Sequence, residues 1–518
     1  MCDLFIRKNR VFSFLDREHT IAGEHYSRWL VPPAALAIHL SIGQAYAFSV
    51  FNLPLSRAVG ISTSAPDDWK LSTIGWVFSV AIVFLGLSAA VFGAWLERVG
   101  PRKAMFVSAL CFASGFQVAA AGVVTHQFWL LLLGYGVLGG IGLGLGYISP
   151  VSTLIRWFPD RPGMATGLAI MGFGGGAMIA SPLSTMLMTF FRSPTSTGVA
   201  PTFAVMGALY FAFMMCGAFM VRVPPSGWRP TRWVAPDRPK ALVTTANVTA
   251  SRAIHTPQFW LLWMVLCLNV TAGIGVLGQA SPMIQEMFPG VISAGAAAGF
   301  VGLLSLANMG GRFFWSSLSD RIGRKGVYGV FFLLGAVLYA LVPATGRAGS
   351  VALFVLGYVV IISMYGGGFA TIPAYLRDMF GTIQVGAIHG RLLTAWSVAG
   401  VLGPVLVNYI REYQIAHGVA KADAYTVTMR IMAALLVLGF ACNALIRAVD
   451  ARFAVSDDDA ALIERSRQSG AFPARNFAAI GLNRTGLAPL LALAWLLVGL
   501  PLAWGVGQVF KKSLDLFR

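Results

Sequence analysis

Arg312 is a charged residue in an otherwise apolar part of the sequence. It lies inside the apolar stretch 294–318, which is long enough to cross a bilayer as a helix. Asn308 precedes it by four residues and therefore shares its helix face. A charge in hydrocarbon costs about 2.5–3.5 kcal/mol on insertion scales, so such residues usually face a cavity or a partner. Arg312 marks a candidate anion site; the alternative is that it extends to the nearby membrane surface.

Acidic side chains do not occur deep within the apolar stretches, which limits the proton chemistry available. The Asp and Glu residues lie in loops or at the edges of these stretches. Asn308 cannot titrate, so the sequence does not support a carboxylate proton relay beside Arg312. His39 lies deep in the first apolar stretch and is a candidate proton or substrate contact, because imidazole titrates near neutral pH. The alternative is a hydrogen-bonded core histidine.

Further polar and aromatic side chains inside apolar stretches could line a binding pocket around an anion. Tyrosine hydroxyls can hold a carboxylate oxygen while the ring excludes water. The alternative is that these aromatic residues face lipid or form a belt at the membrane surface. The candidates are Gln44, Tyr46, Tyr147, Tyr365 and Trp396.

The composition indicates that these side chains sit in a membrane protein. The chain has 518 residues, of which 57% are hydrophobic and 11% are charged, whereas soluble domains carry about 25% charged residues. The net charge of +18 does not indicate a nucleic-acid partner, because the basic residues lie in short loops between apolar stretches. The five cysteines have no metal-ligand spacing. We therefore expect no disulfide framework, no metal site and no cofactor.

Thirteen apolar stretches divide the chain into segments. We predict a cytoplasmic N-terminal extension (1–28), a first six-helix bundle (29–221) and a cytoplasmic linker (222–257). A second six-helix bundle (258–447), a cytoplasmic connector (448–485) and an extra transmembrane helix (486–510) follow. With the N-terminus inside, the inner segments hold 26 Lys and Arg residues and the outer loops hold 6. The positive-inside rule therefore predicts a cytoplasmic N-terminus and an external C-terminus.

Two similar turns indicate an internal repeat. Residues 93–103 read GAWLERVGPRK and residues 316–325 read SSLSDRIGRK, each following the second apolar stretch of its half. Glycine permits a tight turn, and we expect the acid of each turn to pair with a helix terminus or an arginine. Transporters built from parallel repeats bind substrate between the halves at mid-membrane. The predicted conformational residues are Gly93, Glu97, Arg98, Gly100, Asp320, Arg321, Gly323 and Arg324.

Glycine-rich stretches mark where helices approach closely. Residues 134–147 and 172–178 place small residues at three- and four-residue spacings. Small faces allow helices to approach and slide. We predict packing seams here that move during transport.

The paired turns resemble the loop motif of the major facilitator superfamily. Residues 140–183, 224–228, 365–381 and 390–404 are more narrowly similar to the oxalate/formate antiporter family, which is related to bacterial monocarboxylate transporters. The resemblance covers roughly 30–450. It implies an all-α integral membrane protein with two six-helix bundles; the thirteenth helix lies outside the common core.

The resemblance also implies roles for individual residues. An arginine of the eighth helix binds the substrate anion in this family, and that position is Arg312. Oxalate-exchanging members carry a lysine on the eleventh helix where this chain has Trp396. Arg391 lies five residues before Trp396 and is a candidate contact if its long side chain reaches. One fixed cation suits one carboxylate better than two.

The sequence therefore favours a secondary transporter of small monocarboxylates such as formate, lactate or pyruvate, and not an enzyme. An oxalate/formate-type antiporter is the main alternative; a membrane-embedded transferase or a receptor is less well supported. The expected partners are the carboxylate and the lipid bilayer of a bacterial-type inner membrane. We expect a functional monomer. Trp495 and Trp504 of the extra helix suggest either an interface with another membrane chain or a lipid anchor.

Overall fold

The computed structural model describes residues 13–23, 26–225, 227–231, 233, 242–244, 246–456 and 484–514. Residues 1–12 of the predicted N-terminal extension lie outside these ranges. So do most of the predicted connector, including its acidic run at 457–459, and residues 234–241 of the linker.

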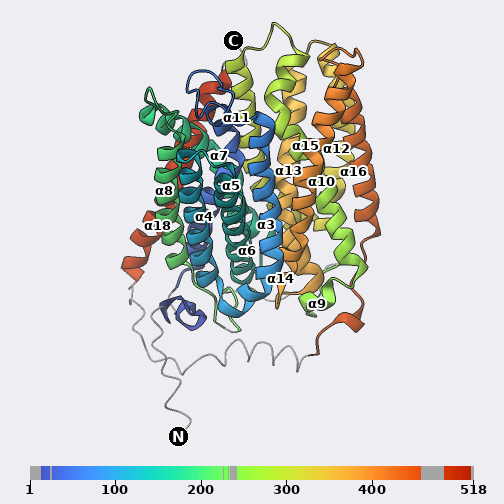
Figure 1. Cartoon of the computed structure of the whole chain (residues 1–518). Helices are drawn as coiled ribbons and strands as arrows, with labels where there is room; N and C mark the ends of the chain where they lie inside the picture. The colour runs from blue at the N-terminus through green and yellow to red at the C-terminus, as the bar shows by residue number, and fades with distance from the viewer. Residues whose placement is uncertain are drawn as a thin grey trace.

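The described chain is built from long helices that run side by side (Figure 1). The first six spans are α1 (Val31–Ile42) with η4 (Gly43–Phe51) and α2 (Asn52–Leu55), α3 (Leu71–Val99), α4 (Pro101–Val124), α5 (Phe128–Leu131) with η5 (Leu132–Leu138) and α6 (Gly139–Trp157), α7 (Pro162–Phe191), and α8 (Val199–Met220). The next six are α10 (Pro257–Met287), α11 (Ala294–Ile322), α12 (Arg324–Arg347), α13 (Val351–Phe380), α14 (Val385–Leu392) with α15 (Thr394–Ala416), and α16 (Thr426–Leu445). The last is α18 (Arg484–Ser513), and the short elements are η1 (Ser13–Leu15), η2 (Arg17–Thr20), η3 (Arg28–Leu30), α9 (Ala250–Ala253) and η6 (Ala451–Phe453).

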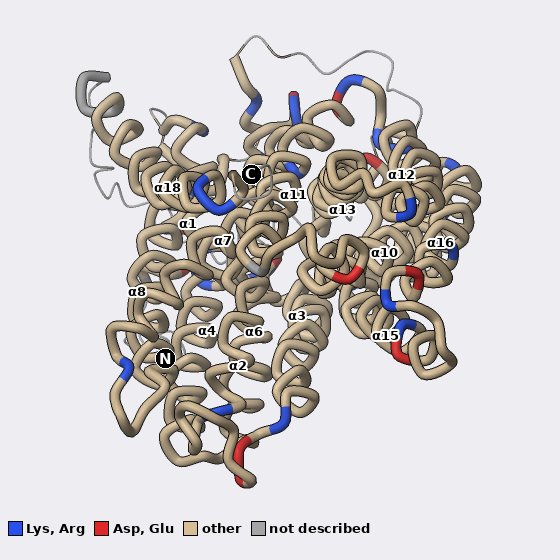
Figure 2. The backbone as a smooth tube through the Cα atoms, turned by 90° about the horizontal axis from the view of Figure 1, so that it is seen from above, with Lys and Arg blue, Asp and Glu red and all other residues tan. Residues whose placement is uncertain are grey.

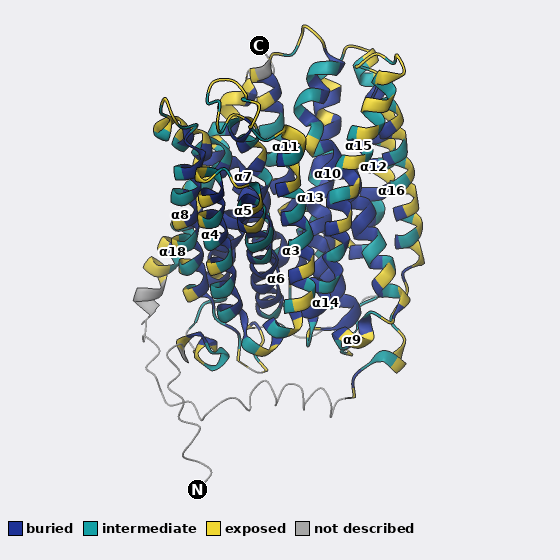
Figure 3. Ribbon diagram, in the orientation of Figure 1, coloured by how far each residue is buried: buried dark blue, intermediate teal, exposed yellow. Residues whose placement is uncertain are grey.

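Twelve of the described helical segments are long and apolar enough to cross a membrane. α11 is not among these twelve; it has 29 residues, carries Arg312, Asp320 and Arg321, and packs against both α7 and α13. Buried residues fill the interior of each group, and large apolar side chains such as Phe190 and Val91 are exposed on the outside (Figure 3). Helices whose backbone bonds are satisfied internally and whose outer faces are apolar suit a bilayer. The chain is a multi-pass membrane protein.

Two breaks in regular helix lie beside predicted site residues. The first span changes at Gly43 from an α-helix to the tighter η4, which carries Tyr46. The eleventh span breaks at Leu393, between α14 with His389 and α15 with Trp396. Irregular turns within a long helix often mark hinges or functional sites. Here they re-aim side chains from both groups toward one place.

The glycine-rich stretches form close seams, as the sequence predicted. A Cβ atom added at Gly167 or Gly174 of α7 would clash with or crowd α11, meeting Ser316 and the Arg312 side chain. Gly140 and Gly144 of α6 approach α3 in the same way. The α7 glycines let the two groups of helices approach closely beside Arg312, whereas the α6 glycines form a seam within the first group.

The acids of the two similar turns each bind a helix N-terminus in the other group. Asp320 accepts hydrogen bonds from the backbone N–H groups of Gly163 (2.9 Å) and Met164 (2.8 Å), where α7 begins. Glu97 accepts one from Gly386 (3.0 Å), where α14 begins, and pairs with Arg156 at 2.6 Å. Negative charge is favourable at a helix N-terminus. The predicted pairing with helix termini and arginines is therefore present at both turns.

The rest of the loop motif surrounds these two contacts. Gly100 and Gly323 have φ of +87° and +85°, which favours glycine. Arg324 binds both Asp320 (2.7 Å) and Asp378 (2.9 Å), whereas Arg98 and Arg321 are exposed. Gly93 packs against Ala387, where a Cβ would come within 2.9 Å of the backbone.

Part of the N-terminal segment folds against the bundle. The buried Arg102 of α4 donates to the carbonyl oxygens of Phe14 (3.1 Å) and Val221 (3.1 Å). Ala22 and Thr20 exchange backbone hydrogen bonds with Val223 at the start of the linker. The described part of the N-terminal extension is thus a packed edge of the first group.

The thirteenth helix lies along the boundary between the two groups. α18 packs against α1, α7 and α11, and Figure 2 shows it beside α1 at the rim of the first group. Leu502 approaches Gly175 of α7, and Val509 approaches Gly302 of α11. Trp495 packs against the cluster of Leu36 and Leu40 in its own chain. Trp495 is half-buried by this contact, and the prediction that the extra helix contacts another membrane chain stays a prediction.

Candidate functional site

Arg312 is enclosed completely, with 0% of its surface exposed. Its Nε donates to Asn308 Oδ1 at 2.9 Å, and its Nη1 donates to the carbonyl oxygen of Ile170 of α7 at 3.4 Å. Its Nη2 makes no hydrogen bond. The alternative that Arg312 reaches the membrane surface is wrong, because Asn308 and α7 hold the guanidinium inside the protein.

Aromatic rings surround this guanidinium. Arg312 Cζ lies 5.6 Å from the ring centre of Phe173 and 5.2 Å from that of Phe369. Trp396 is fully buried, and its ring centre lies 4.4 Å from Phe369 and 5.3 Å from Phe173. Cation–π contacts stabilise a desolvated arginine without neutralising it. The charge of Arg312 therefore stays available to an anion.

Three predicted tyrosines meet at this place from both groups. The hydroxyl groups of Tyr46 (η4) and Tyr365 (α13) are hydrogen-bonded at 2.9 Å across the boundary. Tyr147 of α6 lies with its ring centre 5.3 Å from Trp396. Phe173 also contacts Tyr46, with ring centres 5.0 Å apart, and Tyr365 contacts Phe369 at 5.3 Å. The six rings and Arg312 therefore form one connected cluster, which we call the arginine chamber.

Several donors in the arginine chamber have no hydrogen-bond partner. They are Arg312 Nη2, Trp396 Nε1 and the Tyr147 hydroxyl, all buried. A buried polar group without a partner costs about 1–3 kcal/mol. Each of these donors is free to pair with an acceptor oxygen, and Arg312 adds a positive charge beside them. Bidentate binding of carboxylates is the geometry for which arginine is best suited.

Two of the predicted site residues lie outside the arginine chamber. Gln44 accepts a hydrogen bond from Tyr135 (2.9 Å) inside the first group. The Arg391 side chain donates to the carbonyl oxygen of Ala250 in the linker. It therefore points toward the end of the bundle where α14 begins and is not the second cation of the chamber, since a guanidinium held by a linker carbonyl is directed away from Trp396.

Sequence reasoning missed three residues of this region. Phe173 and Phe369 each adjoin a run of glycines, in GFGGG and GGGF, where close helix approach brings a neighbouring ring onto the arginine. His389, which is 1% exposed, lies 5.8 Å from Tyr147 by ring centres. His389 lies one helical turn before the break at Leu393, and this position could have marked it as a candidate site residue.

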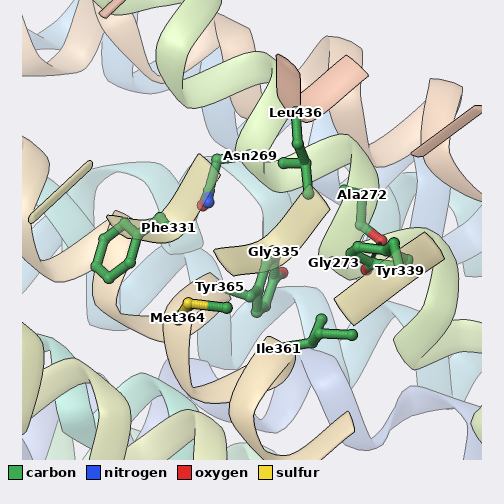
Figure 4. A pocket seen from close by; sticks show the side chains of 10 residues that line it. All are labelled: Asn269, Ala272, Gly273, Phe331, Gly335, Tyr339, Ile361, Met364, Tyr365 and Leu436. Atoms are coloured by element: carbon green, nitrogen blue, oxygen red, sulfur yellow. Dashed lines mark hydrogen bonds between the residues drawn. The ribbon is translucent and has the colours of Figure 1, made fainter. Parts of the chain in front are cut away.

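A separate pocket lies beside the arginine chamber, within the second group (Figure 4). Tyr365 is the residue shared by both, since its ring lines the pocket and its hydroxyl binds Tyr46. The pocket's other lining residues are Asn269, Ala272, Gly273, Phe331, Gly335, Tyr339, Ile361, Met364 and Leu436.

Within the described part of the chain, no group of three or more His, Cys, Asp or Glu residues could hold a metal ion.

The family model of the Major Facilitator Superfamily matches residues 34–404. The chain belongs to the major facilitator superfamily. It is therefore a transporter of this superfamily with a two-bundle fold, and α18 is an addition to that fold.

Two curated relatives and one solved structure illustrate the similarity. The oxalate:formate antiporter of Oxalobacter formigenes is 27% identical over 379 residues, which cover 73% of this chain and 83% of the relative. Apicoplast pyruvate carrier 1 of Toxoplasma gondii is 25% identical over 394 residues, which cover 65% of this chain and 69% of the relative. The human organic anion transporter MFSD10 has a TM-score of 0.59 at 15% identity, over 80% of this chain and 99% of that one. The structural match supports the fold.

Proposed function

We propose that this chain is a secondary transporter of small monocarboxylate anions, of the size of formate, lactate or pyruvate, that works by alternating access. The observation that carries the proposal is the fully buried Arg312, whose Nη2 has no hydrogen-bond partner and whose surrounding aromatic cluster holds two further donors without partners. The bundles 29–221 and 258–447 would contribute one wall each. The similarity to transporters of formate and pyruvate supports the same substrate class.

The number of fixed charges favours a monoanion. Among the described residues that form the arginine chamber, Arg312 is the one cation, and Trp396 supplies an uncharged N–H donor. A second carboxylate would lose its hydration without a counter-charge, which costs several kcal/mol. The antiporter similarity favours oxalate/formate exchange as the second candidate, and a transport assay separates the two.

The test is uptake into proteoliposomes that contain the purified full chain. Vesicles loaded with formate, lactate, pyruvate or oxalate are given radiolabelled lactate outside, at fixed pH and salt. We expect exchange with the monocarboxylates and weak exchange with oxalate. Strong preference for oxalate would replace the monocarboxylate proposal by the antiporter, and no exchange with any of the four would remove the carboxylate assignment.

A further inference from the structure

Two histidines are buried beside the arginine chamber, one in each group of helices. His39 of α1 is 0% exposed and His389 of α14 is 1% exposed. The Nε2 atom of each ring makes no hydrogen bond. The other described histidines, at positions 19, 126, 255 and 417, lie in loops or at helix ends. The proposed carboxylate site leaves both buried imidazoles without a role.

The hydrogen bonding of His39 shows which of its nitrogens can take a proton. Its Nδ1 lies 3.0 Å from the carbonyl oxygen of Ala35, one turn earlier in α1. A carbonyl oxygen only accepts, so Nδ1 carries the hydrogen of the neutral ring. Nε2 is then the lone-pair nitrogen. The Nε2 atom of His39 can therefore accept a proton, because no hydrogen-bond donor of the protein occupies its lone pair.

Tyr147 joins the two histidines to the arginine chamber. Its ring centre lies 5.4 Å from His39 and 5.8 Å from His389. The same ring lies 5.3 Å from Trp396, and its hydroxyl is unpartnered. His39 and Arg312 also pack on neighbouring positions of α7, against Gly172 and Gly174. A proton on either histidine would therefore sit close to an anion bound at Arg312.

Other charged groups around the pair are already engaged. Glu97 of α3 is bonded to Arg156 and Gly386, and Asp378 of α13 is bonded to Arg324 and Arg377. The other charged or titratable side chains of the elements packed against α1 and α14 are Arg28, Tyr46, Arg98, Tyr210, Cys216, Arg252, Cys267, Glu286, Tyr358, Tyr365, Tyr375, Arg391, Tyr409, Arg411, Glu412 and Tyr413, with Lys511 and Lys512 at the far end of α18. The ones that act directly on the pair are Arg312 and Tyr147.

We propose that His39 and His389 form the proton site of this carrier, and that they take up one proton together with one monocarboxylate. The inference rests on the proposed carboxylate site. With the site empty, a proton would place a second positive charge beside Arg312. With the anion bound, the proton and the carboxylate neutralise the excess charge of each other. Binding of one must therefore strengthen binding of the other by the same factor.

The experiment uses labelled lactate and the full chain in proteoliposomes, with two readouts. Net uptake is driven by an acidic exterior while an internal pH dye follows protons; counterflow is measured with equal pH and lactate on both sides. The variants are His39→Gln, His389→Gln and the double variant. His417→Gln is the matched control, because its Nδ1 bonds Tyr413 four residues earlier but its ring is exposed.

We expect wild type and control to accumulate lactate with internal acidification. The double variant should lose gradient-driven accumulation. It should keep counterflow within about threefold of wild type when lactate is saturating on both sides, although it binds lactate with the weaker affinity of the unprotonated site. The lactate Kd of wild type should rise with pH, by up to about tenfold per pH unit, and this slope should disappear in the single variants. The Kd measurement needs only folded protein in detergent, so it decides the question even if the double variant does not reconstitute.

Two different failures can be told apart. If lactate exchanges normally but the double variant still accumulates it under a pH gradient, the histidine proposal is wrong and the carboxylate site stands. If no small carboxylate binds or exchanges, both proposals are overturned.

Discussion

At the scale of single residues, the arginine chamber depends on the planar fork of Arg312. Its Nε and Nη1 are held by Asn308 and Ile170, which leaves the buried Nη2 without a hydrogen-bond partner. A lysine keeps the charge but cannot make this set of contacts.

Arg312→Lys should therefore lower lactate exchange by at least about tenfold, which corresponds to about 1.4 kcal/mol, with normal membrane insertion. Arg430→Lys on the exposed face of α16 is the matched control and should behave as wild type. Exchange rates per folded protein in proteoliposomes provide the measurement. Wild-type exchange by the Arg312 variant would contradict the assignment of the site.

Trp396 decides the charge of the preferred substrate in our proposal. Trp396→Lys adds a second cation to the arginine chamber, so oxalate should gain about tenfold in competition against labelled lactate relative to wild type. Trp129→Lys, at an exposed position of α5, is the control. Size-exclusion profiles check that the variant folds. If the wild-type protein already prefers oxalate, counting the charges of the chamber gives the wrong substrate.

At the scale of helices, two acid-to-helix contacts join the groups at the face where α7 and α14 begin. Each carboxylate belongs to one group and the helix terminus that it binds belongs to the other. A rocking motion of one group against the other must break both contacts, because they cross the boundary.

Asp320→Asn should weaken this closure by about 1 kcal/mol, since the charge at the α7 terminus and the Arg324 ion pair are lost. In a chain whose own cysteines are replaced by serine, a cysteine at the buried Thr166 should then react with a maleimide several times faster. Glu412→Gln, at an exposed position of α15, is the control. An unchanged rate would show that Asp320 does not hold this face closed.

α18 is a second connection between the groups, through α7 on one side and α11 on the other. Leu502→Ala should lower the free energy of unfolding by about 1 kcal/mol through lost packing at Gly175 and Met309, without changing lactate Kd more than about threefold. Leu493→Ala is the control, because that side chain is 65% exposed. Thermal unfolding and binding measurements on both variants test this. Loss of binding by Leu502→Ala would make α18 part of the transport core.

At the scale of the whole molecule, the distribution of basic residues predicts the orientation of the chain across the membrane. Lysines and arginines gather at the helix ends and in the loops (Figure 2). α18 runs in the same direction as α7, since Gly175 meets Leu502 and Met178 meets Gly505. Its C-terminal end therefore lies at the face where α7 ends, opposite the contacts of the N-terminal segment.

We predict that the N-terminal segment lies inside the cell and the end of α18 outside. In the cysteine-free chain, Leu514→Cys should react with an impermeant maleimide on intact cells, because the predicted external face carries few basic residues. Phe14→Cys should react only after permeabilisation. Labelling in the reverse order would invert the proposed orientation.

The sequence alone determined where helices form and which charge was unusual. Runs of apolar residues set the thirteen spans to within a few residues, because hydropathy is a local property that needs no knowledge of neighbours. Arg312 with Asn308 could be recognised for the same reason, since the cost of burying a charge depends on the stretch that carries it. The paired acid–glycine turns were also readable as local patterns.

Only the tertiary structure decided which side chains share a space. Gln44 and Tyr46 lie two residues apart, yet Gln44 faces Tyr135 within its own group and Tyr46 crosses to Tyr365. Arg391 turned toward the linker, while His389, two residues earlier, turned toward Tyr147. These outcomes depend on the change to a tighter helix at Gly43, the break at Leu393 and the glycine seam between α7 and α11. Side-chain direction is set by helix rotation and by contacts between distant segments, and local sequence patterns carry neither.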